Sequence, residues 1–231
     1  MNHAFLGAGA AFAVYAAPAM DPFAVIARHY RPGEESYRVL VAHSVLVASK
    51  AIELARARRL RVPAAEIDLA FLEEIALLHD IGIRWTHAPE IGCAGAEPYI
   101  RHGIIGREVL EKEGLPRHAL ACERHTGAGI PRAEVIERDL PLPQRDFLPV
   151  TLEEKVLCVA DKFYSKKPGR LWRERSPEEV SRTMTRWGER VAERWRALWE
   201  EVCGPAAHGA TERPGTLPAG NVDPSSGRGG A

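Results

Sequence analysis

Residues 76–82, which read ALLHDIG, constrain this chain more than any other stretch. They end a run in which apolar side chains recur every three to four residues, a spacing that predicts a helix: Ile67, Phe71, Ile75 and Leu78. Gly82 is suited to cap that helix, which leaves His79 and Asp80 at its buried end. A carboxylate in apolar surroundings is costly unless it is paired or metal-bound. The pair therefore indicates either a metal site or a core histidine beside a helix-end turn.

The composition limits the classes of function that the chain can have. Its 231 residues suit one domain with a full core, and its 31 basic and 31 acidic residues give a formal net charge of zero. We therefore expect no general attraction to a nucleic-acid polymer or to an anionic membrane. The four cysteines lack CxxC spacing, which argues against a disulfide framework or a structural zinc site and favours a reducing, cytoplasmic location.

The two ends of the chain differ in composition from the middle. Residues 1–20 contain an Ala-rich apolar stretch that is too short to span a membrane and has no Lys or Arg before it. We expect an N-terminal extension there rather than a signal peptide. Residues 204–231 are rich in Gly, Pro, Ala and Ser and have almost no large apolar side chain, so we expect a disordered tail.

Helical periodicity accounts for most of the chain between these ends. Strands are hardly signalled and no internal repeat is visible, so the predicted fold is all-α. The predicted helices are a short one from residue 23 and then 34–59, 64–79, 102–114, 117–124, 151–167 and 176–202. The breaker-rich segments 83–100 and 127–149 should be ordered loops that shape a pocket mouth.

The last predicted helix carries three tryptophans at helical spacing: Trp187, Trp195 and Trp199. We interpret them as core residues or as a surface for a homodimer. On this reading, residues 171–203 pack against a single domain formed by residues 21–170.

Six residues lie at or near the end of a predicted helix or within its apolar face: His43, His79, Asp80, His102, His125 and Asp161. A lone His such as His43 is by itself more often a core residue than a ligand. His102 begins a helix, where the cationic form is disfavoured and the imidazole stays free for a metal. Asp161 needs a partner, which could be Lys162, a backbone amide or a metal. Together these side chains suit Fe, Mn, Co, Ni or Zn.

The order of these residues, H…HD…H…H…D, resembles the HD superfamily of metal-dependent phosphohydrolases, and Ile81 and Gly82 complete the HDIG form of its motif. The resemblance covers about residues 21–170 and implies a single helical HD domain with two divalent transition metals. One metal would be held by the first His, the HD pair and the last Asp, while two further His recruit the second and Asp80 bridges them. On this sequence the two sets are His43, His79, Asp80 and Asp161, and then Asp80, His102 and His125.

Local sequence contexts narrow the resemblance. Those of His102 (HGIIGREVL), His125 (RHTGAGI) and Asp161 (VLCVADKF) are similar to small bacterial HD enzymes that hydrolyse dinucleoside polyphosphates. They match the HD-GYP phosphodiesterases less well, because Ala121 and Cys122 stand where that group has a paired His, and GAGIP lacks its Tyr.

The resemblance implies that a metal-activated hydroxide attacks a small-molecule phosphoester such as a nucleotide. Lys162 and Arg124 are the nearest basic residues in sequence that could stabilise the phosphoryl oxygens, with Asp80 as the bridging ligand. The basic residues Lys162, Lys166 and Lys167 are either a solvated helix face or a patch that faces phosphate.

Two other classes of function remain open. The same ligand order resembles HD-fold di-iron oxygenases, in which the metals bind dioxygen, so the ligands alone do not separate a hydrolase from an oxygenase. An oxygenase would need iron and consume oxygen, whereas a hydrolase would work anaerobically. The third class is a metal-stabilised binding protein that uses the tryptophan-bearing helix as a partner surface.

Overall fold

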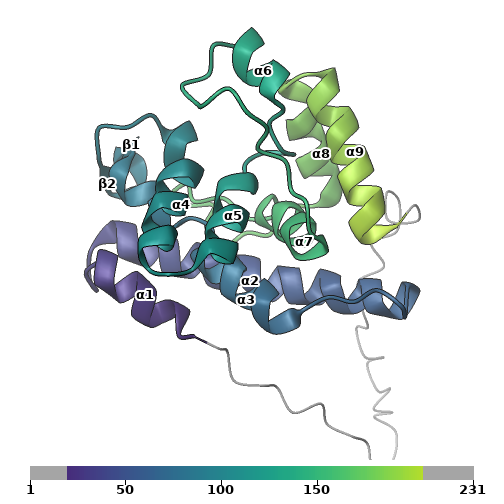
Figure 1. The fold of residues 1–231 in the computed structure, drawn as a ribbon, viewed down its shortest axis with the longest axis horizontal. Coiled ribbons are helices and arrows are strands. Elements are labelled where there is room, and N and C mark those ends of the chain that lie inside the picture. Colours follow the sequence, from purple (N-terminus) through teal and green to yellow (C-terminus); the bar gives the residue numbers. More distant parts are fainter. Residues whose placement is uncertain (1–19, 205–231) are drawn as a thin grey trace, which may run out of the picture.

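A computed structural model of the chain describes residues 20–204. Within this range the structure consists of nine α-helices and three short 3-10 helices, with one two-stranded antiparallel pair, β1 (His87–Ala88) and β2 (Cys93–Ala94) (Figure 1). The predicted all-α fold is therefore confirmed. The predicted extension and tail, at 1–20 and 204–231, lie almost entirely outside the described residues.

The helix bounds follow local capping chemistry. Asp21, Asp68, Thr151 and Ser176 each accept a hydrogen bond from a backbone amide in the first turn of the helix that follows, which satisfies donors that a helix start leaves free. The helices are α1 (Pro22–His29), α2 (Glu35–Arg61), α3 (Leu69–Leu78), α4 (His102–Lys112), α5 (Pro116–Arg124), α6 (Arg132–Glu137), α7 (Leu152–Asp161), α8 (Pro177–Arg186) and α9 (Glu189–Cys203). The 3-10 helices are η1 (Ile81–Trp85), η2 (Pro89–Ile91) and η3 (Tyr99–Arg101).

Several predicted elements differ from the structure. The predicted helix 176–202 is two helices, because Gly188 adopts a φ of 123° and breaks it after Trp187. Gly82 does not cap α3, whose C-cap is His79; it lies in η1 with its backbone against α4. The predicted helix 64–79 begins only at Leu69, and the predicted loop 127–149 contains α6.

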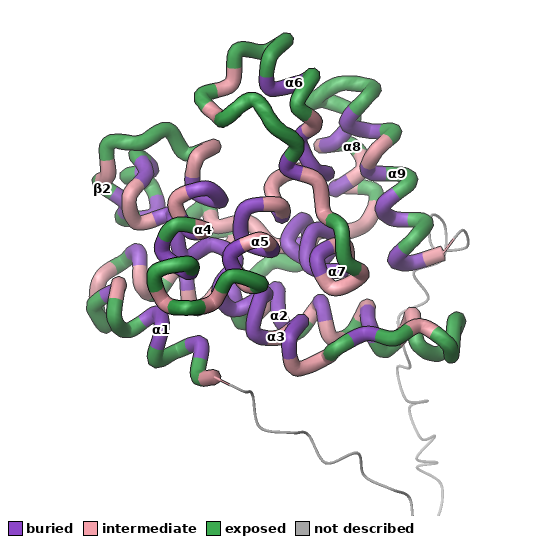
Figure 2. Tube along the Cα trace, in the orientation of Figure 1, coloured by how far each residue is buried: buried purple, intermediate pink, exposed green. Residues whose placement is uncertain are grey.

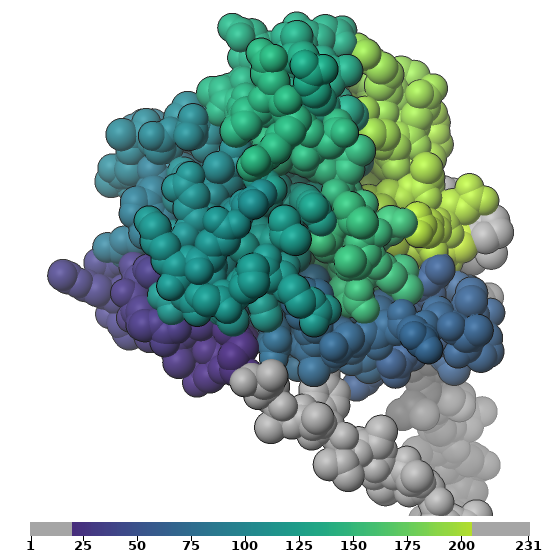
Figure 3. Space-filling model, viewed as in Figure 1, coloured from purple at the N-terminus to yellow at the C-terminus, as the bar shows by residue number. Residues whose placement is uncertain are grey.

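The C-terminal helices α8 and α9 pack against each other and along one side of the 130–150 segment (Figure 3). Buried and exposed residues alternate along α9 (Figure 2), with Trp195 and Trp199 buried, whereas Trp187, between the two helices, is 50% exposed. Arg190 and Arg194 of α9 form 2.5 Å ion pairs with acids of α6. Among residues 20–204, no helix combines the length and apolarity that crossing a bilayer would require.

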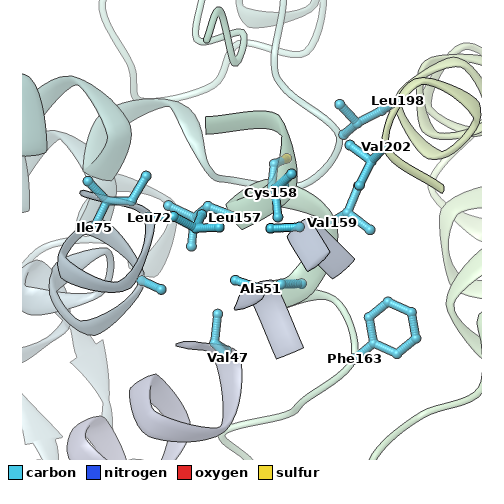
Figure 4. Packing of buried hydrophobic residues seen from close by; sticks show 14 of the residues in the cluster. Val47, Ala51, Leu72, Ile75, Leu157, Cys158, Val159, Phe163, Leu198 and Val202 are labelled. Atoms are coloured by element: carbon cyan, nitrogen blue, oxygen red, sulfur yellow. The ribbon is translucent and has the colours of Figure 1, made fainter. Parts of the chain in front are cut away.

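The core lies where α2, α3, α7 and α9 meet (Figure 4). Residues 156–161 of α7 are all buried, so this helix is covered on every side at its C-terminal end. A second apolar cluster lies where α1, η1, α4 and α5 meet, and α3 contributes to both clusters, with Leu77 in the first and Leu78 in the second. The residues that follow, His79 and Asp80, therefore fall at the boundary between the two clusters.

Candidate metal centre

The six predicted metal ligands come together at that boundary, each at most 7% exposed. They arrive from the middle of α2, the ends of α3, α5 and α7, and the start of α4. They form two groups that share Asp80: His43, His79, Asp80 and Asp161 in the first, and Asp80, His102 and His125 in the second. Within each group the potential ligand atoms all lie within 4.8 Å of one another.

Helix ends fix the orientation of three of the imidazoles. In each, Nδ1 lies 2.6–2.7 Å from the carbonyl oxygen three residues earlier, so Nδ1 carries the proton and donates it. The other ring nitrogen, Nε2, is then directed at the centre and presents a lone pair there whenever the imidazole is neutral, as metal ligation requires. The three pairs are His79 with Ala76, His102 with Tyr99, and His125 with Cys122.

Unsatisfied polar atoms show that the site fits a cation. Both carboxylate oxygens of Asp80 and Nε2 of His79 are buried and make no hydrogen bond of acceptable geometry, although nitrogens lie within ion-pair distance of Asp80. Nε2 of His102 lies 3.0 Å from Nε2 of His125, which brings two lone pairs face to face when both Nδ1 atoms are protonated. Buried polar atoms left in this way are costly, and a cation between them would satisfy them. Four imidazoles and two carboxylates suit transition metals.

The electrostatics keep both carboxylates charged. Burial opposes ionisation, but His79 and Lys166 hold the pKa of Asp80 well below its usual range, and Lys162 and Lys166 do the same for Asp161. Burial lowers the pKa of His79 as well, yet the two carboxylates outweigh it and raise that pKa to about 9. Burial and the neighbouring His125 lower the pKa of His102 to about 3, so its imidazole is neutral.

Lys166 is the functional candidate that the sequence did not single out. Its Nζ lies 2.6 Å from Oδ2 of Asp80, with 13% of the side chain exposed. Lys162, which was predicted to act on the substrate, also lies at the site: it pairs with Asp161 and donates to the carbonyl oxygen of His125 at 3.3 Å. The only signal for Lys166 was its place among the three lysines after Asp161.

Arg124, the other basic residue predicted to act on the substrate, is not brought into this group. Its guanidinium pairs with Glu154 of α7 at 3.1 Å, and Glu154 in turn accepts a hydrogen bond from the amide of Val150. Arg124 therefore ties α5 to the start of α7 and does not line the pocket beside the ligands.

A pocket of about 430 Å³ opens onto the metal centre, with His102, His125 and Asp161 on its inner side. Glu90, Ile91 and Tyr99 contribute from the first segment predicted to shape a pocket mouth, whereas the predicted loop 127–149 contributes Gly127 alone. Its remaining wall comes from the residues after α5, from the segment after α7 and from the break between α8 and α9: Thr126, Gly127, Lys162, Tyr164, Ser165, Lys166, Lys167, Arg175 and Trp187.

Comparison with known proteins gives one family and several relatives. Residues 40–165 match the model of the HD domain. An uncharacterized protein of Methanocaldococcus jannaschii is 41% identical over 123 residues, which cover 53% of this chain and 64% of that protein. The tRNA (cytidine(56)-2'-O)-methyltransferase of Picrophilus torridus is 41% identical over 91 residues, 39% of this chain and 23% of the enzyme. The enzyme of that name in Thermoplasma volcanium is 28% identical over 137 residues, 59% of this chain and 34% of the enzyme.

The chain thus spans less than two thirds of the length of each of these relatives. No solved structure matches it.

Proposed function

Because the chain belongs to the HD domain family, whose members are mostly metal-dependent phosphohydrolases, we propose that it hydrolyses a nucleotide or a related small phosphoester at a binuclear metal centre. The observation that carries the proposal is the pair of buried donor groups that share Asp80. One metal would be held by the group containing His43 and Asp161, and the other by the group containing His102 and His125. The donors suit Fe, Mn, Co, Ni or Zn.

When bound, a pair of such cations supplies Lewis acidity and lowers the pKa of coordinated water. The chain contributes the rest. The imidazoles of His102 and His125, whose pKa values are lowered, are held with Nε2 deprotonated, whereas His79, whose pKa is raised to about 9, would release a proton on binding a metal. Lys162 and Lys166 place two positive charges at the inner side of the pocket, where they would stabilise negative charge on the phosphoryl oxygens.

The same features favour a hydrolase over a di-iron oxygenase. The donor set would serve either chemistry, but the pocket wall carries Lys162, Lys166, Lys167 and Arg175 and only one carboxylate besides Asp161, that of Glu90. Such a wall selects an anionic substrate. The pocket volume of about 430 Å³ lies in the range of small-molecule sites. We also propose a cytoplasmic location, because all four cysteines are buried free thiols.

The first test is elemental analysis of protein purified without added metal, followed by anaerobic assays of a nucleotide panel. We expect about two transition-metal ions per chain and release of phosphate or nucleotide. Asp80→Asn should lose metal and slow turnover by at least about 100-fold, since it removes the shared ligand. Asp146→Asn, the same change at an exposed aspartate outside the pocket, is the matched control and should leave both unchanged.

Two results would contradict the proposal. Protein without bound metal that gains no activity with any of the five metals would mean that the donor groups do not form a centre. Two irons per chain with oxygen consumption and no anaerobic cleavage would assign the site to an oxygenase.

A further inference from the structure

We call the pocket of about 430 Å³ that opens onto the candidate metal centre the metal pocket. A second pocket, of about 540 Å³, lies beside it and is lined mainly by cationic side chains. It is formed by the segment after α7 and by α8, and it shares Ser165, Lys167, Arg175 and Trp187 with the metal pocket. The two hollows are therefore continuous along one wall. We call the second one the arginine pocket; its basic residues are Lys167, Arg170, Arg173, Arg175, Arg182 and Arg186.

Most of this positive charge has no ion-pair partner among the described residues. The one acid lining the arginine pocket, Glu179, pairs with Arg173 at 2.7 Å. Within residues 20–204, no carboxylate oxygen lies within 4.0 Å of a side-chain nitrogen of the other five basic residues, of which Arg175 donates to backbone oxygens and four remain: Lys167, Arg170, Arg182 and Arg186. Arg182 is partly balanced by the charge of Glu178, but the other charges that line this hollow repel each other, and a bound polyanion would relieve that repulsion.

Arg175 holds the two pockets together. Its guanidinium donates to the carbonyl oxygens of Lys162 at 3.1 Å and of Glu179 at 3.0 Å, which links the segment after α7 to α8. Burial and the charges of nearby arginines lower its pKa from the ordinary value, which agrees with a surplus of positive charge at this wall. Because the link is made through backbone oxygens, the arginine pocket has a fixed position relative to Lys162 and the metal centre.

From this continuity we propose that the arginine pocket binds the distal phosphates of a nucleoside polyphosphate whose scissile phosphorus lies at the metal centre. This assignment of substrate class rests on the proposed phosphoester hydrolysis. Arg guanidinium groups bind phosphate oxygens in a bidentate manner, and about four charges match a chain of two or three phosphates. Trp187, half exposed and lining both pockets, offers a face on which the base can stack.

The charge distribution favours a short phosphate chain over a nucleic-acid strand. The uncompensated cations gather in one hollow rather than in a stripe along the surface, and the whole chain has a formal net charge of zero. A strand would need cations spaced along its backbone over a longer path.

Inorganic tripolyphosphate isolates the binding part of this proposal. Titration calorimetry on the full-length protein should show binding that weakens with added salt. The double variant Arg170→Gln/Arg182→Gln should bind at least about tenfold more weakly, because it loses two charge-assisted contacts. The matched control Arg38→Gln/Arg56→Gln removes two exposed arginines of α2, which also have no salt bridge to any residue of the described range 20–204, and should bind within about twofold of the wild type.

The proposal falls if the wild type does not bind tripolyphosphate, or if both double variants bind equally well. It also falls if a single-stranded oligonucleotide binds more tightly than tripolyphosphate and loses affinity in the arginine variant. Circular dichroism and thermal unfolding of both variants establish that they are folded, and Arg186→Gln provides a second, single-site test.

Failure of this inference is distinguishable from failure of the proposed function. Asp80→Asn should still bind tripolyphosphate while it loses hydrolysis, because the arginine pocket does not contain Asp80. If the wild type binds tripolyphosphate but hydrolyses no substrate, the result would support the arginine pocket and contradict the proposed hydrolase function. If Arg170→Gln/Arg182→Gln hydrolyses polyphosphate substrates with an unchanged KM, the result would support the hydrolase function and contradict the proposed role of the arginine pocket.

Discussion

The backbone of Gly82, the last residue of the HDIG motif, lies very close to the backbone of α4. A Cβ at this position would overlap the carbonyl oxygen of His102 and lie 2.5 Å from the backbone nitrogen of Gly106. Both neighbours are backbone atoms of α4, so no side chain can turn aside to make room. Gly82→Ala should therefore force η1 and α4 apart at the turn of α4 that carries the ligand His102.

Overpacking in a closed interior lowers the free energy of unfolding by about 1–3 kcal/mol. Because the new Cβ of Gly82→Ala would meet two backbone atoms, we expect a loss at the upper end of this range, about 3 kcal/mol. For a domain of this size, that loss corresponds to a Tm lower by about 6–12 °C. Metal affinity should fall as well, because His102 moves away from Asp80. The measurements are thermal unfolding with and without a chelator, and metal content after dialysis.

Gly114→Ala is the matched control, because Gly114 has open space around it but a φ of 75°. Its free energy of unfolding should fall by about 1 kcal/mol, because alanine is strained in left-handed backbone, and its metal content should not change. If Gly82→Ala and Gly114→Ala had the same Tm and the same metal content, the close approach would not be what requires glycine in this motif.

Three further predictions follow from single contacts. In chelator-treated protein, protonated His79 contributes stability that is fully present below its unfolded pKa of about 6.5 and is lost as pH rises through its folded pKa of about 9; urea unfolding should show a loss of up to about 3 kcal/mol across this window, and a constant value would contradict the charge assignment. Tyr30→Phe should cost about 2 kcal/mol, since the buried hydroxyl donates to the carbonyl of Ile81 at 2.7 Å and accepts from the amide of Arg84 at 3.0 Å; an unchanged Tm would mean that water replaces it. Arg124→Ala should lower stability by about 1–2 kcal/mol but leave turnover within about twofold, and a large loss of turnover at unchanged stability would restore its predicted role at the substrate.

The six predicted ligands come together in the structure in large part because helix ends determine where their side chains point. Each of His79 and His125 follows the last residue of a helix, and its Nδ1 bonds to a carbonyl three residues back. That geometry is local, so a pattern of His and Asp at predicted helix ends carries most of the information about the site. The confirmed all-α fold has the same origin, since the apolar periodicity is also local.

The sequence left open whether Lys166 faces solvent or phosphate, because its position depends on how the chain leaves α7. The periodicity extends the predicted helix to residue 167, which would place Lys162 and Lys166 one above the other on one helix face. In the structure α7 ends at Asp161, and the chain turns so that Lys166 returns to Asp80. The spacing of apolar residues predicts neither the early end of the helix nor the turn that follows it.

The break between α8 and α9 was missed for a related reason. Apolar residues continue at helical spacing on both sides of Gly188, and a single glycine inside a helical pattern is tolerated often enough to be read as part of it. The consequence is functional, because the break exposes Trp187 where the metal pocket and the arginine pocket meet. In the continuous helix that the sequence predicts, Trp187 would instead lie on the same face as the buried Trp195 and Trp199.

The place of the candidate metal centre in the fold would couple metal binding to stability. Leu77 packs in one apolar cluster and Leu78 in the other, so the charged side chains of His79, Asp80 and their partners form a polar layer between two closed cores. Neither cluster can move to cover unsatisfied carboxylate oxygens without opening the other. A cation held by this layer would stabilise both clusters at once, because it would supply the counter-charge to Asp80 that His79 and Lys166 supply in this structure.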